Sequence, residues 1–216
     1  MNYIVNKTYH FSNIRGKGDQ YMDWFTIGKN AIANQGGIRV RSFWYQNKIK
    51  APYNIPSLIV LISNNHEKNK SINPWEPAEF DQVSGLLEYK GDSRKYKKNS
   101  MEEDPRAKLE HMGNKQFRKI EQLLKEEGKY WLPPLLYFSS VSQGVYSFKG
   151  LFFAKYVETY FDHSPEVEKE NYKLHCRRMD IEKIPLSWLR DRCLAKDINN
   201  FDNERAPEEW KMRALT

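Results

Sequence analysis

Two short segments of the sequence contain residue types that could recognise a nucleobase. Trp75 and Tyr89 offer flat apolar rings. Glu76 and Asp92 offer carboxylates next to those rings in the sequence. A base that leaves a DNA duplex needs a flat wall to stack against and a polar group on its edge, and a carboxylate can accept a hydrogen bond from the exocyclic amine of cytosine. These four residues are therefore predicted to form a base pocket. Taken alone, they fit core aromatics and a turn aspartate somewhat better.

A turn with two adjacent glycines carries a second set of predicted DNA contacts. Gly36-Gly37 implies a tight turn or a close approach of two backbones. A polar side chain on such a turn can enter the duplex and pair with the base left behind, while nearby arginines hold phosphates. The predicted groove-inserting loop comprises Asn34, Gln35, Arg39 and Arg41. A surface hairpin with solvated arginines is the alternative, and this segment alone favours it.

Basic residues gather around Gly91-Asp92 and at the start of a helix predicted further along the chain. Each phosphate that a basic side chain neutralises releases counterions, so such a group favours DNA binding. The predicted phosphate-binding residues are Lys90, Arg94, Lys95, Asn114 and Lys115. A solvated charged loop is the more common explanation of such a run.

An alternative function is metal-dependent DNA cleavage. Asp81, Glu88 and Lys90 match the loose Asp-spacer-Glu-x-Lys pattern of metal-dependent nucleases. On a strand, Glu88 and Lys90 would share one face, which suits a metal ligand beside a lysine that orients water. The pattern is short, however, and the chain lacks the alternating helices and strands of a nuclease core.

Other enzyme signatures are absent from the sequence. There is no GxSxG, P-loop, HExxH or GxGxxG motif. The five histidines and two cysteines show no metal-ligand spacing. We therefore predict no catalytic residue, no metal and no cofactor.

These residues must be positioned by a strand-rich chain. Alternating residue types predict a strand over 38–45 with arginines on one face, and the apolar run over 56–63 predicts a buried strand. Helical spacing predicts a helix over 114–127, capped by Asn114 and ended by Gly128. Further strands are predicted over 86–90, 135–141, 145–160 and 172–181, and short helices over 185–193 and 207–213. Short turns between neighbouring strands favour antiparallel pairing. We predict an α+β fold in one domain over 1–216, with a closed or nearly closed, mostly antiparallel β-barrel and flanking helices.

The composition favours a globular protein with a polyanionic partner. The chain has 216 residues, 39% hydrophobic residues and a net charge of +7. No apolar run approaches the roughly 18 residues of a membrane span, and the first ten residues lack the features of a signal peptide. Aromatic residues make up 14% of the chain, which fits base stacking and also fits a β-rich core. We therefore expect a cytoplasmic protein that fits a polyanionic partner and binds no membrane.

The order of the motifs resembles one known family, the AspBHI-type and MspJI-type modification-dependent restriction endonucleases. Residues 34–39 resemble the N-terminal loop of that family, and residues 73–76 and 89–92 resemble its "NPWED … YxGD" pattern. The later landmarks of the family are matched in this chain by residues 113–114, 133–138, 148–151, 171–172, 185–189 and 206–211. Each piece is short, but the set covers nearly the whole chain in the right order.

The resemblance implies an SRA-like (PUA-like) domain that recognises 5-methylcytosine or a related modified cytosine in duplex DNA by base flipping. By position, Trp75 and Asp92 fall in the base pocket of that family and Gln35 in its groove-inserting loop. The sequence departs from the pattern at Pro77 and in the longer charged segment 93–110, which leaves the exact base and its sequence context open.

The resemblance also implies a nuclease domain or subunit as a partner, in cis or in trans. The chain ends soon after the last landmark, so we expect the reading half alone. A B3-like barrel that reads an unmodified sequence in the major groove without base flipping is a further alternative.

Overall fold

The structure is a computed structural model that describes residues 1–11, 19–22, 33–35, 37–42, 56–63, 78–91, 112–125, 132–164, 167–194 and 205–214. Its strands are β1 (Asn2–Ile4), β2 (Thr8–His10), β3 (Ala33–Gln35), β4 (Ile38–Ser42), β5 (Pro56–Ser63), β6 (Ala78–Phe80), β7 (Leu86–Lys90), β8 (Leu135–Ser142), β9 (Val145–Ser164), β10 (Val167–Arg178) and β11 (Lys183–Pro185). Its helices are α3 (Met112–Lys125), α4 (Leu186–Leu194) and α5 (Glu208–Ala214). No helix in these ranges is long and apolar enough to cross a membrane.

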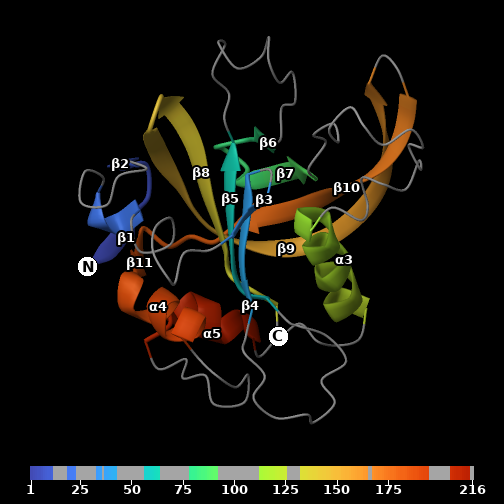
Figure 1. Ribbon diagram of the computed structural model, residues 1–216. Helices are drawn as coiled ribbons and strands as arrows, with labels where there is room; N and C mark the ends of the chain where they lie inside the picture. The colour runs from blue at the N-terminus through green and yellow to red at the C-terminus, as the bar shows by residue number, and fades with distance from the viewer. Residues whose placement is uncertain are drawn as a thin grey trace.

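One large sheet organises the molecule (Figure 1). Its strand order is β3-β4-β5-β8-β9-β10-β7-β6, with β2 paired to β9, and β1 and β11 form a separate pair. All pairs are antiparallel except β5 with β8. The prediction of a mostly antiparallel α+β fold is therefore confirmed. The prediction of a closed or nearly closed barrel left closure open, and the described strands form an open sheet, because β3 and β6 are the two ends of the strand order.

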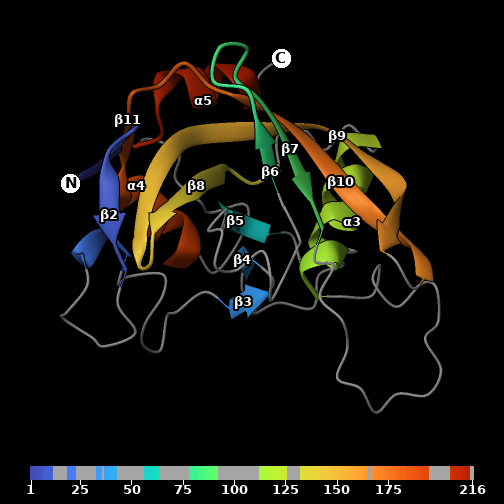
Figure 2. The same ribbon diagram turned by 90° about the horizontal axis from the view of Figure 1, so that it is seen from above.

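The sheet instead curls into a half-barrel, as the view from above shows (Figure 2). The long strand β9 bends where it carries extra residues. Tyr137 pairs with Gly150 while the next residue, Phe138, pairs with Phe148, so Lys149 bulges out of the ladder. A second register shift lies opposite His175. Each β-bulge increases the local twist and bends the strand, which turns β10, β7 and β6 back toward β5.

Apolar side chains fill both sides of the curled sheet. On the concave side, residues of every strand from β4 to β10 pack around Phe117, Ile120 and Leu123 of α3. On the other side, a second cluster packs against α4 and α5. Strand β5 contributes Ile59 and Leu61 to the first cluster and its alternate residues to the second. This burial on both faces explains why its sequence is continuously apolar.

The helix predicted over 114–127 is confirmed as α3, but its first residue was predicted wrongly. The helix begins at Met112, so Asn114 lies inside the first turn and is not the cap. Its side chain is fully buried and donates a hydrogen bond to Asn171 on β10. A tertiary hydrogen bond therefore replaces the local capping bond that the sequence pattern suggested.

A buried arginine joins α4 to the sheet. Arg192 is 1% exposed, and its Nε donates a hydrogen bond to the carbonyl oxygen of Ser57 at 2.9 Å. Its guanidinium carbon lies 5.9 Å from the ring centroid of Trp188 and 6.0 Å from that of Trp210. The arginine thus packs against two tryptophans, whose own ring centroids are 5.6 Å apart, and satisfies a buried carbonyl.

We expect Arg192→Ala to lower the free energy of unfolding by about 2–4 kcal/mol, because it removes packing and leaves a buried carbonyl without this donor. Urea unfolding followed by circular dichroism measures the change. Arg190→Ala, an exposed position on the same helix, is the control and should shift stability by no more than about 0.5 kcal/mol. Equal effects of the two substitutions would contradict the structural role of Arg192.

Candidate nucleic-acid interface

The β3–β4 turn is anchored to the rest of the fold at Gly37. The Gly37 carbonyl accepts a hydrogen bond from the Ile62 amide at 2.8 Å. Gly37 has a φ of 80°, and a Cβ at this position would lie 2.5 Å from the Ile62 carbonyl oxygen and 2.7 Å from the Tyr89 hydroxyl. Only glycine fits such a site. The close backbone approach predicted for this turn is therefore confirmed at Gly37, whereas Gly36 lies outside the described residues.

Tyr89 reaches across the half-barrel to the same place. Its hydroxyl donates a hydrogen bond to the Ile62 carbonyl oxygen at 2.8 Å, although β8, β9 and β10 separate β7 from β5 in the sheet. Its ring is fully buried and meets Phe117 and Tyr137 edge-on, at centroid distances of 6.3 and 6.5 Å. Its predicted role as a base-stacking wall stays a prediction, and the contacts that the structure shows for it are internal.

The main chain of the predicted groove-inserting loop extends from this anchor. Asn34 pairs with Arg39, and Gln35 pairs with Ile38, across the β3–β4 ladder. For Asn34, Gln35 and Arg41 the structure describes only the main chain. Ile38 is buried in the concave cluster, so Arg39 points to the opposite face of β4, as the alternation predicted.

Arg39 is half-buried beside aromatic rings. Its guanidinium carbon lies 6.0 Å from the ring centroid of Phe11. Burial lowers the pKa of Arg39, and the electrostatic influence of Tyr146 opposes that shift. An arginine with a partly dehydrated guanidinium gives up less hydration when it meets a phosphate.

Strand β7 ends at a buried polar cluster formed by Gly91, Asn114 and Asn171. The Gly91 amide donates to the Tyr172 carbonyl oxygen at 2.7 Å. Asn114 donates from Nδ2 to Asn171 Oδ1 at 2.9 Å, and both asparagines are fully buried. The phosphate contact predicted for Asn114 stays a prediction, because the contact seen here is internal. The preceding residue, Lys90, forms an ion pair with Glu79 at 2.9 Å.

Two lysines on α3 place positive charge beside that cluster. Lys115 and Lys119 are one helical turn apart and both are half-buried. Burial and the charge of Lys115 lower the pKa of Lys119. The phosphate contact predicted for Lys115 stays a prediction, and Lys119, four residues further along the helix, was not among the predicted contacts.

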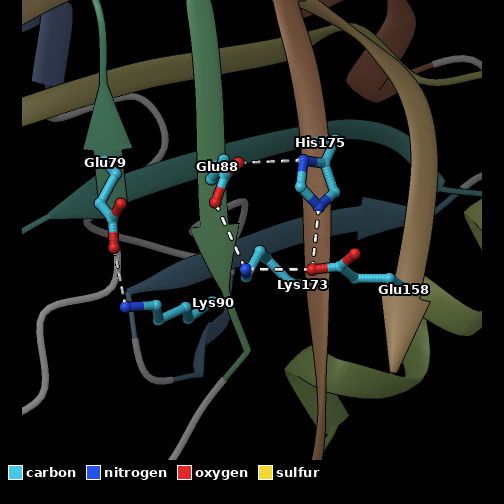
Figure 3. A network of polar contacts seen from close by, with 6 residues as sticks. All are labelled: Glu79, Glu88, Lys90, Glu158, Lys173 and His175. Carbon is cyan, nitrogen blue, oxygen red and sulfur yellow. Dashed lines mark hydrogen bonds and ion pairs between the residues drawn. The ribbon is translucent and has the colours of Figure 1, made fainter. Parts of the chain in front are cut away.

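The residues of the alternative nuclease pattern do not meet in one site. Glu88 and Lys90 do share a face of β7, as predicted, but Glu88 contacts Lys173 at 3.3 Å while Lys90 contacts Glu79 (Figure 3). Asp81 accepts hydrogen bonds from Ser84 and from the Val83 amide, which lower its pKa and close the turn between β6 and β7.

Glu88 belongs to a network of polar contacts across β7, β10 and β9 (Figure 3). Lys173 and His175 each lie between the same two carboxylates, those of Glu88 and Glu158. The hydrogen bond from Lys173 is the main reason that the pKa of Glu158 is lowered. In the described ranges no group of three or more His, Cys, Asp or Glu side chains could hold a metal ion. The predicted alternative site is therefore not formed there.

Several predicted site residues lie outside the described ranges. They are Trp75, Glu76, Asp92, Arg94 and Lys95. Their roles stay predictions. The described residues next to them in the sequence, Gly91 above all, determine where the main chain leaves the sheet toward Asp92.

Comparison with known proteins assigns the family. A family model described as the N-terminal region of restriction endonuclease AspBHI matches residues 3–214. The chain belongs to this family. The resemblance inferred from the ordered motifs is thus confirmed. No curated protein matches the chain significantly.

Three solved structures have the fold of this AspBHI-family chain. The DNA modification-dependent restriction endonuclease AspBHI has a TM-score of 0.69 at 21% identity, over 99% of this chain and 90% of that one. The DNA recognition domain of the cytosine modification-dependent restriction endonuclease LpnPI has a TM-score of 0.61 at 21% identity, over 98% and 88%. MspJI restriction endonuclease, solved with a 27-mer oligonucleotide, has a TM-score of 0.72 at 20% identity, over 99% of this chain and 51% of that one.

The anchor of the β3–β4 turn in this AspBHI-family fold can be tested at Gly37. We expect Gly37→Ala to lower the free energy of unfolding by about 2–4 kcal/mol, because it combines a strained φ with a clash against the Ile62 carbonyl. Gly85→Ala is the matched control, since its φ of 70° is similar but its nearest neighbour, Arg178 Cβ, is 3.3 Å away. Urea unfolding of both variants isolates the close approach, and equal losses would show that Gly37 is required only for its φ.

Proposed function

We propose that the chain reads modified cytosine in duplex DNA by taking the base out of the helix, as the recognition module of a modification-dependent restriction system. The observation that carries this proposal is the family match over residues 3–214. It is supported by the LpnPI recognition domain, whose name refers to cytosine modification, and by MspJI, which was solved with an oligonucleotide. The arrangement of the described residues suggests how the chain performs each step.

The β3–β4 turn is suited to enter the duplex. Its Gln35 can pair with the base left behind when the modified cytosine is extruded. The turn is short, paired as a hairpin, and anchored at Gly37 to both β5 and Tyr89. A preordered turn loses little conformational entropy on binding, which favours insertion over a flexible loop of the same composition.

The extruded base then needs a pocket, which we assign to the segments that contain Trp75 and Asp92. The Trp75 ring stacks on the base, and the Asp92 carboxylate accepts a hydrogen bond from the exocyclic amine. Extrusion costs a few kcal/mol, and stacking on an aromatic side chain returns about 1–3 kcal/mol per base. Glu76 lies next to Trp75 in the sequence and completes the proposed pocket.

Phosphate contacts provide affinity that does not depend on sequence or modification. Among the described residues we assign phosphate contacts to Lys115 and Lys119, which lie one helical turn apart on α3. Arg39 adds a partly dehydrated guanidinium near the β3–β4 turn. Because each neutralised phosphate releases counterions, binding to any duplex weakens as salt rises.

We infer that this chain recognises DNA and does not cut it. The residues of the alternative nuclease pattern have separate structural partners in the described ranges. The chain spans about half the length of MspJI, the relative with the 27-mer oligonucleotide. A nuclease domain or subunit, in cis or in trans, is the partner that this function requires.

The proposal predicts that Asp92→Ala abolishes discrimination. The protein should bind a duplex with one 5-methylcytosine more tightly than the same unmodified duplex, by about 10- to 100-fold. Asp92→Ala should reduce that ratio to about one, because the carboxylate holds only a base that has left the helix, and the modified base is the one extruded. Binding to unmodified DNA should stay almost unchanged, because phosphate contacts remain. Fluorescence anisotropy at fixed salt measures both affinities.

Asp180→Ala controls for the change in net charge. Asp180 is exposed and follows the end of β10 that pairs with Leu86, whereas Gly91 lies beside the other part of that strand. It should keep the full discrimination. Equal affinity of the unaltered protein for both duplexes would contradict the proposal, and so would cleavage of either duplex by the purified chain with Mg²⁺.

A further inference from the structure

Three motifs that are far apart in the sequence meet at one point in the fold. Gly91 ends β7, Asn114 lies in the first turn of α3, and Asn171 lies on β10. Each belongs to a separate landmark of the family resemblance, and the helix cap predicted for Asn114 is not what the structure shows. Their meeting point lies one residue before Asp92.

Asn171 makes three hydrogen bonds that fix its orientation. Its Oδ1 accepts from Asn114 Nδ2 at 2.9 Å and from the Tyr172 amide at 2.8 Å. Its Nδ2 donates to the Gly91 carbonyl oxygen at 3.2 Å. A rotated amide would direct its NH2 group at two donors, so only one orientation satisfies this network.

Both peptide groups of Gly91 are held as a result. Its amide donates to the Tyr172 carbonyl, and its carbonyl accepts from Asn171. A Cβ on Gly91 would lie 2.5 Å from Asn171 Oδ1 and 2.6 Å from Asn114 Oδ1. The two asparagines therefore enclose the glycine so tightly that no side chain fits there.

We propose that the Asn114–Asn171 pair positions Asp92 for reading the base, although neither asparagine touches DNA. This inference rests on the proposed function. A hydrogen bond to the edge of a base needs its acceptor within a few tenths of an ångström of the right place. Because Asp92 is bonded directly to Gly91, the clamp on the Gly91 main chain fixes the point from which the carboxylate extends. Asn114 and Asn171 are thus specificity-determining residues that act through the main chain.

The experiment compares three variants with the unaltered protein. Asn171→Ala removes the clamp, and Asn114→Ala removes one of its bonds while placing the best helix former in α3. Tyr137→Phe is the matched control, because it removes a different buried side-chain hydrogen bond, between Tyr137 and Ser63 at 2.8 Å. For all four proteins, the affinities for the modified and unmodified duplexes are measured at a temperature well below the unfolding midpoint. Asp92→Ala is the reference for lost discrimination.

We expect Asn171→Ala to reduce the ratio of the two affinities by about tenfold or more, with affinity for unmodified DNA changed by less than about twofold. Asn114→Ala should reduce the ratio in the same direction, and it keeps the test decisive if Asn171→Ala does not fold. Tyr137→Phe should keep the full ratio.

Two results overturn the inference in different ways. If the asparagine variants discriminate as well as the unaltered protein while Asp92→Ala does not, the clamp has no role in reading and the proposed function stands. If the unaltered protein itself does not discriminate, the proposed function fails, and the positioning role fails with it.

Discussion

The hydrogen bond from the Tyr89 hydroxyl to the Ile62 carbonyl is the constraint on which the arrangement of this half-barrel depends. Strands β8, β9 and β10 lie between the two residues in the sheet, so the contact crosses the concave side. Phe80 on β6 and Tyr137 on β8 meet in the same way, with ring centroids 5.8 Å apart. Side chains thus hold the curled sheet together where the described strands are not paired. Gly37 must be glycine because this contact brings the Tyr89 hydroxyl within reach of any Cβ.

This constraint links the two proposed reading elements. The turn that carries Gln35 is anchored at Gly37, and the strand that leads to Asp92 contains Tyr89. A protein that flips a base must act on the hole in the duplex and on the extruded base at a fixed separation. A rigid cross-connection through the core sets such a separation, whereas two independent surface loops would have to be ordered during binding.

Local patterns in the sequence predicted those elements whose burial follows a simple period. Strand β5 is buried on both faces, and α3 repeats apolar residues every three to four positions, so both were predicted nearly in place. No strand was predicted before residue 38, and the structure adds β1 and β2, whose Tyr3 and Tyr9 are fully buried. In strands of three residues a single inward side chain carries no periodic signal. The burial of Arg192 and the pairing of Asn114 with Asn171 depend on partners far away in the sequence, which local patterns do not show.

The central claim is that the modified base leaves the helix, and fluorescence of a base analogue tests it most directly. A fluorescent adenine analogue placed next to 5-methylcytosine is quenched by stacking and brightens when its neighbour is extruded. We predict a rise in fluorescence when the protein saturates the modified duplex, and little change with the unmodified duplex at equal saturation. Saturated binding of the modified duplex without a rise would contradict base flipping. It would favour a protein that reads the major groove while the DNA duplex stays intact.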